Sequence, residues 1–161
     1  MTKHTTNPKN TLTDATKAEK EHFLEQYEHI KQRIQILTDR IRNMKADQYA
    51  IRATDYGHEK TASTNKKTDL SDLVSRTIDN TDAITAEIEE LNATARYIYN
   101  TLRIRTENIK HLNILELYYI DGKTRQQCAD ALDLWHVNSF DKKRSQALNS
   151  FHLKQEDIYN D

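Results

Sequence analysis

Glycine and proline are almost absent from this chain of 161 residues, which has two glycines, Gly57 and Gly122, and one proline, Pro8. Sandwiches and barrels of β-strands need many tight turns, and turns draw on glycine, proline and asparagine. A Rossmann or P-loop phosphate site needs a glycine-rich loop, which two isolated glycines cannot form. The scarcity therefore excludes these folds and favours long helices with few turns.

Cysteine and long hydrophobic runs are also scarce. Cys128 is the only cysteine, so no disulfide can form within the chain, and a reducing cytoplasm is the expected compartment. No run approaches the roughly 20 apolar residues of a membrane-spanning helix, so no membrane association is expected. Residues 1–12 are polar, which argues against a secretory signal and predicts a flexible tail.

The polar residues show no pattern of a catalytic or metal site. Lys and Arg number 24 against 25 Asp and Glu, so nucleic-acid binding would need a local basic patch. The seven histidines are scattered, without the His-x3-His or Cys-x2-Cys spacing of zinc sites. Because no Ser-His-Asp or Cys-His arrangement is recognisable either, we expect no enzyme, no metal and no cofactor.

Apolar residues in the first third of the chain repeat with heptad spacing. Their steps alternate between 4 and 3, at Phe23, Tyr27, Ile30, Ile34, Leu37, Ile41 and Met44. This spacing is typical of a long helix whose narrow apolar seam packs against another helix. Thr13 and Asp14 offer N-cap side chains for its start. The polar stretch 54–68 contains Gly57 and has no periodicity, so it predicts a loop.

A second heptad series follows that loop. Its members are Leu70, Val74, Thr77, Thr81, Ile84, Ile88, Leu91, Ala95, Ile98 and Leu102. Residues 1–53 carry 10 basic and 7 acidic side chains, a net charge of +3, whereas residues 70–107 carry 4 and 7, a net charge of −3. Opposite charge favours pairing of the two helices, so residues 13–107 are expected to form an antiparallel hairpin. The same seams could instead pair across a dimer.

Shorter elements are predicted between residues 108 and 153, with a tail over 154–161. The pattern indicates helices near Leu112–Asp121, Arg125–Leu132 and His136–Phe151. Gly122 follows the first of these as a left-handed cap would, and Thr124 with Gln127 three residues later forms a capping-box pattern. Three short helices joined by brief turns predict a helix-turn-helix unit.

Most apolar residues of this segment are expected to lie in its core. Cys128, Ala129 and Leu132 share one face of the middle helix, while Phe140, Ala147, Leu148 and Phe151 share one face of the last helix. Trp135, in the turn between these helices, is expected to be buried against the middle helix. Packing is also the expected role of the tyrosines at positions 97, 99, 118 and 119.

The outward face of the last helix carries side chains that hold phosphates or read base edges. The candidate DNA-binding residues are Lys123, Arg125, Gln126, His136, Asn138, Ser139, Lys142, Lys143 and Gln146. Arg125 and Gln126 would face the DNA backbone, and the triplet Lys142-Lys143-Arg144 would supply positive charge. Asp130 and Asp141 would repel phosphate, which indicates a narrow contact.

The stretch Leu115–Phe151 resembles region four of sigma factors. The matching positions, in order, are Tyr119, Gly122, Thr124, Ala129, Leu132, Ala147 and Leu148. The stretch departs from the pattern twice, because the turn before the last helix is one residue longer and Arg144 stands at a usually apolar position. The longer turn would re-aim the last helix.

The layout of the whole chain is similar to the ArpU/RinA-like phage transcriptional regulators, which join helical N-terminal segments to such a unit. That resemblance implies an activator of late phage or prophage genes for packaging or lysis, acting on double-stranded DNA as a dimer and contacting RNA polymerase or another regulator. One alternative is a coiled-coil interaction protein that modulates such a regulator without binding DNA. A small terminase subunit is a further alternative, although its DNA-binding part would come first in the chain and its subunits would form a ring.

Overall fold

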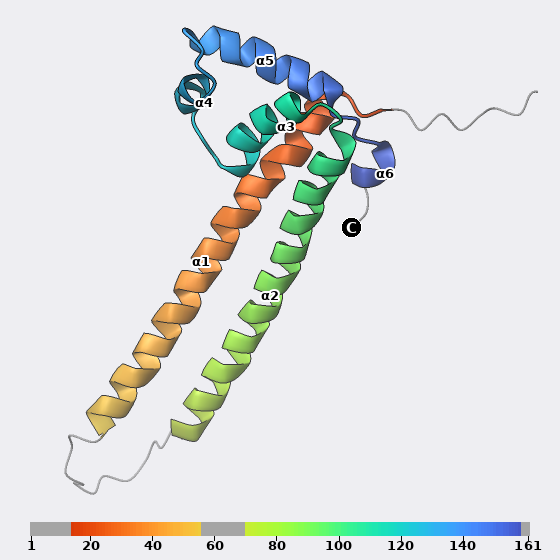
Figure 1. The fold of residues 1–161 in the computed structure, drawn as a ribbon. Helices are drawn as coiled ribbons and strands as arrows, with labels where there is room; N and C mark the ends of the chain where they lie inside the picture. Colours follow the sequence, from red (N-terminus) through yellow and green to blue (C-terminus); the bar gives the residue numbers. More distant parts are fainter. Residues whose placement is uncertain (1–13, 56–69, 159–161) are drawn as a thin grey trace, which may run out of the picture. The chain divides into compact units, whose positions relative to one another are not determined.

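The computed structural model describes residues 14–55 and 70–158, and within these ranges every regular element is a helix (Figure 1). The elements are α1 (Lys17–Asp55), α2 (Leu70–Arg105), α3 (Ile109–Leu115), η1 (Glu116–Ile120), α4 (Arg125–Ala131), α5 (Val137–Ser150) and α6 (Gln155–Ile158). The expected all-α fold, a long helical hairpin followed by shorter helices, is confirmed. The tail at 1–12 and the loop at 54–68 lie outside the described residues, except that α1 continues through Asp55.

The heptad seams are the packed faces of α1 and α2. Every expected seam position from Phe23 to Met44, and from Val74 to Leu102, is buried or half-buried. The residues between them are mostly exposed, as Ile36 is at 61%. Within these described helices, none is long and apolar enough to cross a membrane.

Residues 29–97 form one of two compact units, which we call the hairpin unit. Among its described residues, the buried apolar side chains are those of Leu37, Ile84 and Ala95. Arg33 bridges the two helices, since its Nη2 and Nε atoms lie 2.9 and 3.0 Å from Oε1 of Glu87. This ion pair joins the net positive first helix to the net negative second helix, as the charge pattern predicts.

The other compact unit, here the terminal unit, combines residues 14–28 with residues 98–158. Its core draws on both long helices, through Leu24 of α1 and Leu102 of α2, which are fully buried with Leu115 and Phe151. The ring centroids of Phe23 and Phe151 are 6.3 Å apart. The unit therefore does not begin at the expected boundary near residue 108, because the short helices use the ends of the long helices as part of their core.

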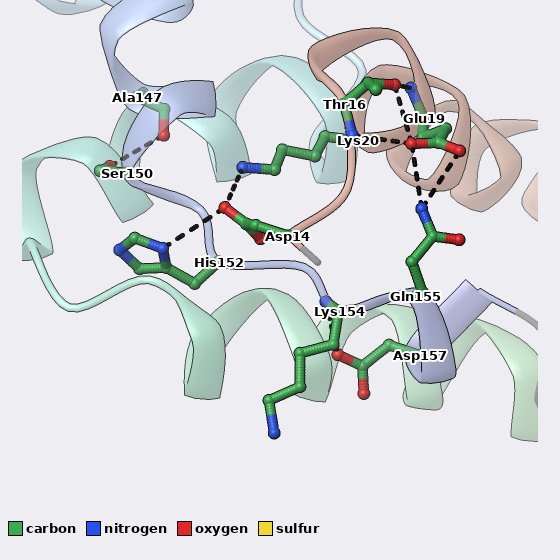
Figure 2. Close-up of polar contacts among 10 residues, drawn as sticks. All are labelled: Asp14, Thr16, Glu19, Lys20, Ala147, Ser150, His152, Lys154, Gln155 and Asp157. Atoms are coloured by element: carbon green, nitrogen blue, oxygen red, sulfur yellow. Dashed lines mark hydrogen bonds and ion pairs between the residues drawn. The ribbon is translucent and has the colours of Figure 1, made fainter. Parts of the chain in front are cut away.

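The segment that follows α5 is fixed to the start of the described chain (Figure 2). The Ala15 amide donates to the Leu153 carbonyl at 2.8 Å. The Asp14 carboxylate lies 3.0 Å from Lys20 Nζ and 3.6 Å from His152 Nδ1. We call this set of contacts the terminal clasp.

The expected tail at 154–161 contains structure as far as residue 158. The Lys154 amide donates to Asp157 Oδ2 at 3.1 Å at the start of α6. Arg105, in the last turn of α2, pairs with Asp157 at 3.2 Å. Gln155 points toward Glu19 in Figure 2, with its Nε2 atom 3.4 Å from each carboxylate oxygen. These polar contacts hold α6 in the terminal unit.

Candidate nucleic-acid interface

Two predicted caps set the start of α4. Gly122 has a φ of +65°, the left-handed conformation that favours glycine. The Gln127 amide donates to Thr124 Oγ1 at 3.3 Å, and the Thr124 amide donates to Gln127 Oε1 at 2.9 Å. The capping box is therefore present, and both amides at the helix start are satisfied without solvent.

The helix that precedes Gly122 ends in a π-helical turn, which the sequence pattern does not reveal. The Asp121 amide donates to the Glu116 carbonyl at 2.9 Å, five residues back. Tyr119 is buried in this turn, and its ring lies edge-on to Tyr118 at 4.9 Å. Tyr118 in turn lies 5.7 Å from the ring of Phe140. The wider turn thus places Tyr118 and Tyr119 against the core that lies under the inner face of α5. Both tyrosines have the packing role that was expected for them.

The inner face of α5 matches its prediction. Phe140, Ala147, Leu148 and Phe151 have no exposed surface. Cys128 and Ala129 of α4 are also fully enclosed, and burial raises the pKa of the Cys128 thiol. The absence of a larger side chain at Ala129 lets α4 lie close to its neighbours. α5 is consequently held in one orientation by α3 and α4.

The outer face of α5 carries most of the predicted DNA-binding residues. Asn138, Lys142, Lys143 and Gln146 are exposed, and Ser139 is half-buried. His136 is exposed at the N-cap position, where its side chain makes no capping hydrogen bond. Among the described residues, none of these side chains has an intramolecular ion pair or hydrogen bond. The face is therefore available to an external ligand.

The predicted residues near the start of α4 have acidic partners instead. Arg125 forms a two-pronged ion pair with Asp141 of α5, and this hydrogen bonding raises the pKa of the guanidinium. Gln126 donates to Asp130 at 2.8 Å. The structure thus pairs Arg125 with an acid that we expected only to weaken phosphate contact.

Lys123 differs from the lysines of α5 because it lies near an acid. Its Nζ atom is 3.8 Å from Asp121 Oδ2, and its side chain is 40% exposed. Among the predicted DNA-binding residues, Lys142 and Lys143 are therefore the cations without an ion pair in the described structure. The charges of Lys123 and Arg125 are partly neutralised by Asp121 and Asp141.

Arg144 does not belong to the exposed basic triplet. Its guanidinium lies over the Tyr118 ring, with Cζ 4.8 Å from the ring centroid. Its Nη2 atom is 3.8 Å from Glu21 of α1. The arginine is therefore accommodated on this side of α5 by stacking on an aromatic ring and by approaching an acid with its terminal nitrogen.

The expectation that Trp135 is buried is wrong. Its side chain is 96% exposed rather than buried against α4. Asp133 has a φ of +52°, and the Leu134 amide donates to the Ala129 carbonyl at 2.9 Å. This tight turn leaves Leu134 half-buried and directs the indole away from the core. A shallow hollow lined by Asp130, Asp133, Leu134 and Trp135 results.

No cluster of three or more His, Cys, Asp or Glu side chains suited to a metal ion occurs in residues 14–55 and 70–158. His111 and Ser150 do meet, with Nδ1 2.7 Å from Oγ. The Ser150 hydroxyl is also bonded to the Ala147 carbonyl at 2.8 Å. This pair ties α3 to the last turn of α5, which is a structural role.

Comparisons of the chain with protein-family models, with curated proteins and with solved structures give no match. Its function is therefore argued from the surface of α4 and α5.

Proposed function

We propose that this protein is a DNA-binding transcriptional regulator that inserts α5 into the major groove. The observation that carries the proposal is the outer face of α5, where Asn138, Lys142, Lys143 and Gln146 are exposed and unpaired within the described structure. An α-helix fits the major groove, where amide side chains can read base edges and lysines can contact phosphates. The closely packed inner face of α5 supports this role, because it holds the helix that carries those side chains in one orientation.

The charge of the surface supports a small footprint. Asp130 lies on α4, and Asp141 precedes Lys142 and Lys143 on α5, so one subunit would contact few phosphates. Each lost phosphate contact lowers the slope of log K against log salt by roughly 0.9 on duplex DNA. Two half-sites bound by a dimer would supply the missing affinity.

The finer proposal follows the resemblance to phage regulators. The protein would act in the bacterial cytoplasm as an activator of late phage or prophage genes, and the helical hairpin would dimerise or contact RNA polymerase or another regulator. It would work as a binding protein without catalysis. Solution mass separates the assemblies, because a dimer has twice the chain mass of 18.9 kDa and a terminase-like ring has many times that mass.

Mobility shift with DNA fragments from around its own gene tests the proposal. The wild type is compared with Lys142→Ala/Lys143→Ala across a salt series. We expect one fragment to shift, with affinity at least tenfold lower in the variant and a salt slope shallower by about 2 for each bound subunit. Lys45→Ala/Lys110→Ala is the matched control, because it removes the same charge from exposed lysines elsewhere.

Two results would contradict the proposal. One is the absence of any shift at moderate salt with folded protein. The other is an equal loss of affinity in both double variants, which would show a general charge effect without a role for α5. Either result would favour the alternative in which the chain regulates transcription through protein contacts alone.

A further inference from the structure

The hollow at the α4–α5 turn combines an exposed aromatic ring with two carboxylates. Asp130, Asp133, Leu134 and Trp135 line it. Indole rings are enriched at the centres of protein interfaces, where they contribute much of the binding energy. An indole left 96% exposed on a rigid turn is therefore unusual for a surface that serves only the fold.

The turn is fixed by its backbone rather than by the tryptophan side chain. The Leu132 amide donates to the Cys128 carbonyl at 3.1 Å, and the Asp133 amide donates to the Asp130 carbonyl at 3.2 Å. Trp135 makes no aromatic or cation–π contact within the described chain. The backbone of the turn is thus fixed by hydrogen bonds, while the exposed indole has no ring partner among the described residues and is open to one.

The charge of the hollow selects the partner. Among the described residues, neither Asp130 nor Asp133 has an ion pair, and the side chain of Asp130 accepts one hydrogen bond, from Gln126. Two carboxylates beside an open indole repel phosphate but suit a guanidinium, which stacks on an aromatic face while donating to a carboxylate. Nucleic acid is therefore the less suitable occupant.

We propose that this hollow is a docking site for an arginine side chain of a partner protein, separate from the outer face of α5. The site takes its stacking surface from Trp135 and its charge from Asp130 and Asp133. This proposal goes beyond DNA binding, because it gives the pair of helices α4 and α5 a second binding surface, which recognises protein.

Trp135 is the only tryptophan in the chain, so its fluorescence reports directly on the site. The probe is the peptide Gly-Arg-Gly-Arg-Gly, and the matched control peptide has citrulline, a neutral isostere, in place of each arginine. We expect saturable quenching or a spectral shift with the arginine peptide only. Asp130→Asn/Asp133→Asn should weaken it roughly fivefold or more, whereas Asp79→Asn/Asp82→Asn in the hairpin unit should leave it unchanged.

Several outcomes would overturn the proposal. These are no saturable response to the arginine peptide, an equal response to the citrulline peptide, or unchanged affinity in Asp130→Asn/Asp133→Asn. A response of Trp135 to duplex DNA alone would assign the ring to the nucleic acid instead. Mobility shift with Trp135→Phe separates the two proposals, because that variant should bind DNA as the wild type does even if no arginine docks.

Discussion

Arg144 and Tyr118 form a stacked pair between α5 and η1, with the guanidinium carbon 4.8 Å from the ring centroid. The side chain of Arg144 is 24% exposed, and its Nε atom is buried with no hydrogen-bond partner in the described structure. The arginine therefore gives up hydration that the ring and Glu21 replace only in part. Its contribution is to the orientation of α5 rather than to the charge of the outer face.

Replacement of Arg144 should accordingly change stability. Arg144→Gln is expected to lower the free energy of unfolding by about 1–2 kcal/mol through loss of the stacking and the contact with Glu21. Arg144→Met should recover stability, because an apolar side chain suits this position and leaves no desolvated donor. Urea unfolding followed by circular dichroism measures both, with Lys143→Gln as the exposed control. Equal stability of Arg144→Gln and the control would contradict the packing role.

Release of Arg125 from its acidic partner should strengthen DNA binding. In Asp141→Asn, the guanidinium becomes free to reach a phosphate and one repelling carboxylate is removed. We expect affinity to rise roughly threefold to tenfold and the salt slope to steepen by about 1 for each bound subunit. A salt series of mobility shifts measures this, and Asp79→Asn controls for the change in net charge. Unchanged or weaker binding by Asp141→Asn would show that Arg125 acts only as a link between α4 and α5.

Two neighbouring residues of α1 test the register of the hairpin. Leu37 is 2% exposed, whereas Ile36 is 61% exposed. Leu37→Ala should cost about 2–5 kcal/mol of unfolding free energy, because it leaves a cavity in the seam. Ile36→Ala should stay within about 0.5 kcal/mol of the wild type. Denaturant unfolding of both variants gives the comparison, and similar losses at the two positions would mean that the seam runs elsewhere.

Tyr119 predicts the behaviour of the protein at high pH. Burial raises the pKa of its phenol well above the ordinary value, so the folded state keeps the neutral form. In the unfolded chain the phenol ionises near pH 10. The contribution to stability is therefore fully present below about pH 10 and is lost as pH rises above it. Burial also raises the pKa of the Cys128 thiol, so ionisation of this thiol in the unfolded chain lowers stability in the same way. Its effect starts at a lower pH, because a free thiol ionises at a lower pH than a phenol.

Tyr119→Phe should flatten that alkaline loss. The Tyr119 hydroxyl is buried with no hydrogen-bond partner among the described residues, so its removal should be neutral or stabilising by up to about 1 kcal/mol at pH 7. Thermal unfolding between pH 7 and pH 11 measures both effects. Tyr49→Phe, at a position that is 69% exposed, should follow the wild-type curve. A steeper alkaline decline in Tyr119→Phe would refute the assignment.

The sequence predicts the long helices because their seams repeat in a local pattern. Heptad spacing alone identifies Leu37 and Ile84 as buried positions, and capping chemistry alone identifies Gly122 and Thr124. These features depend on residues a few positions apart in the chain, so they can be predicted from the local sequence. The composition of the outer face of α5 is predictable for the same reason.

The sequence predicts an exposed Arg144 and a buried Trp135, and the structure contradicts both predictions. Each prediction followed from the charge or hydrophobicity of the side chain, which does not determine where the backbone places it. Arg144 follows Phe140 by four residues and precedes Ala147 by three, which is the spacing of the buried face. Its charge suggested solvent, although an aromatic ring was available beside it. Trp135 is apolar and suggested burial, but the left-handed turn at Asp133 directs it outward. Nothing in the local sequence predicts that turn.

The boundary of the terminal unit depends on contacts between distant residues. Phe23 meets Phe151, and Asp14 meets His152, across more than a hundred residues of chain. Such pairs carry no periodic signal. A division drawn from changes in local composition therefore assigns the ends of α1 and α2 to the hairpin alone, although their side chains complete the core around α5.

The terminal clasp also determines the order in which parts of the newly synthesised chain can fold. The parts of α1 and α2 that form the hairpin unit have both been synthesised once residue 97 is added, and their seam can close from that stage. The first turns of α1 must wait, because Ala15 and Phe23 find their partners only after residues 151–153 have been synthesised. Loss of residues 151–158 would therefore leave Ala15 and Phe23 without these partners, and the first turns of α1 would lose part of the surface on which they pack.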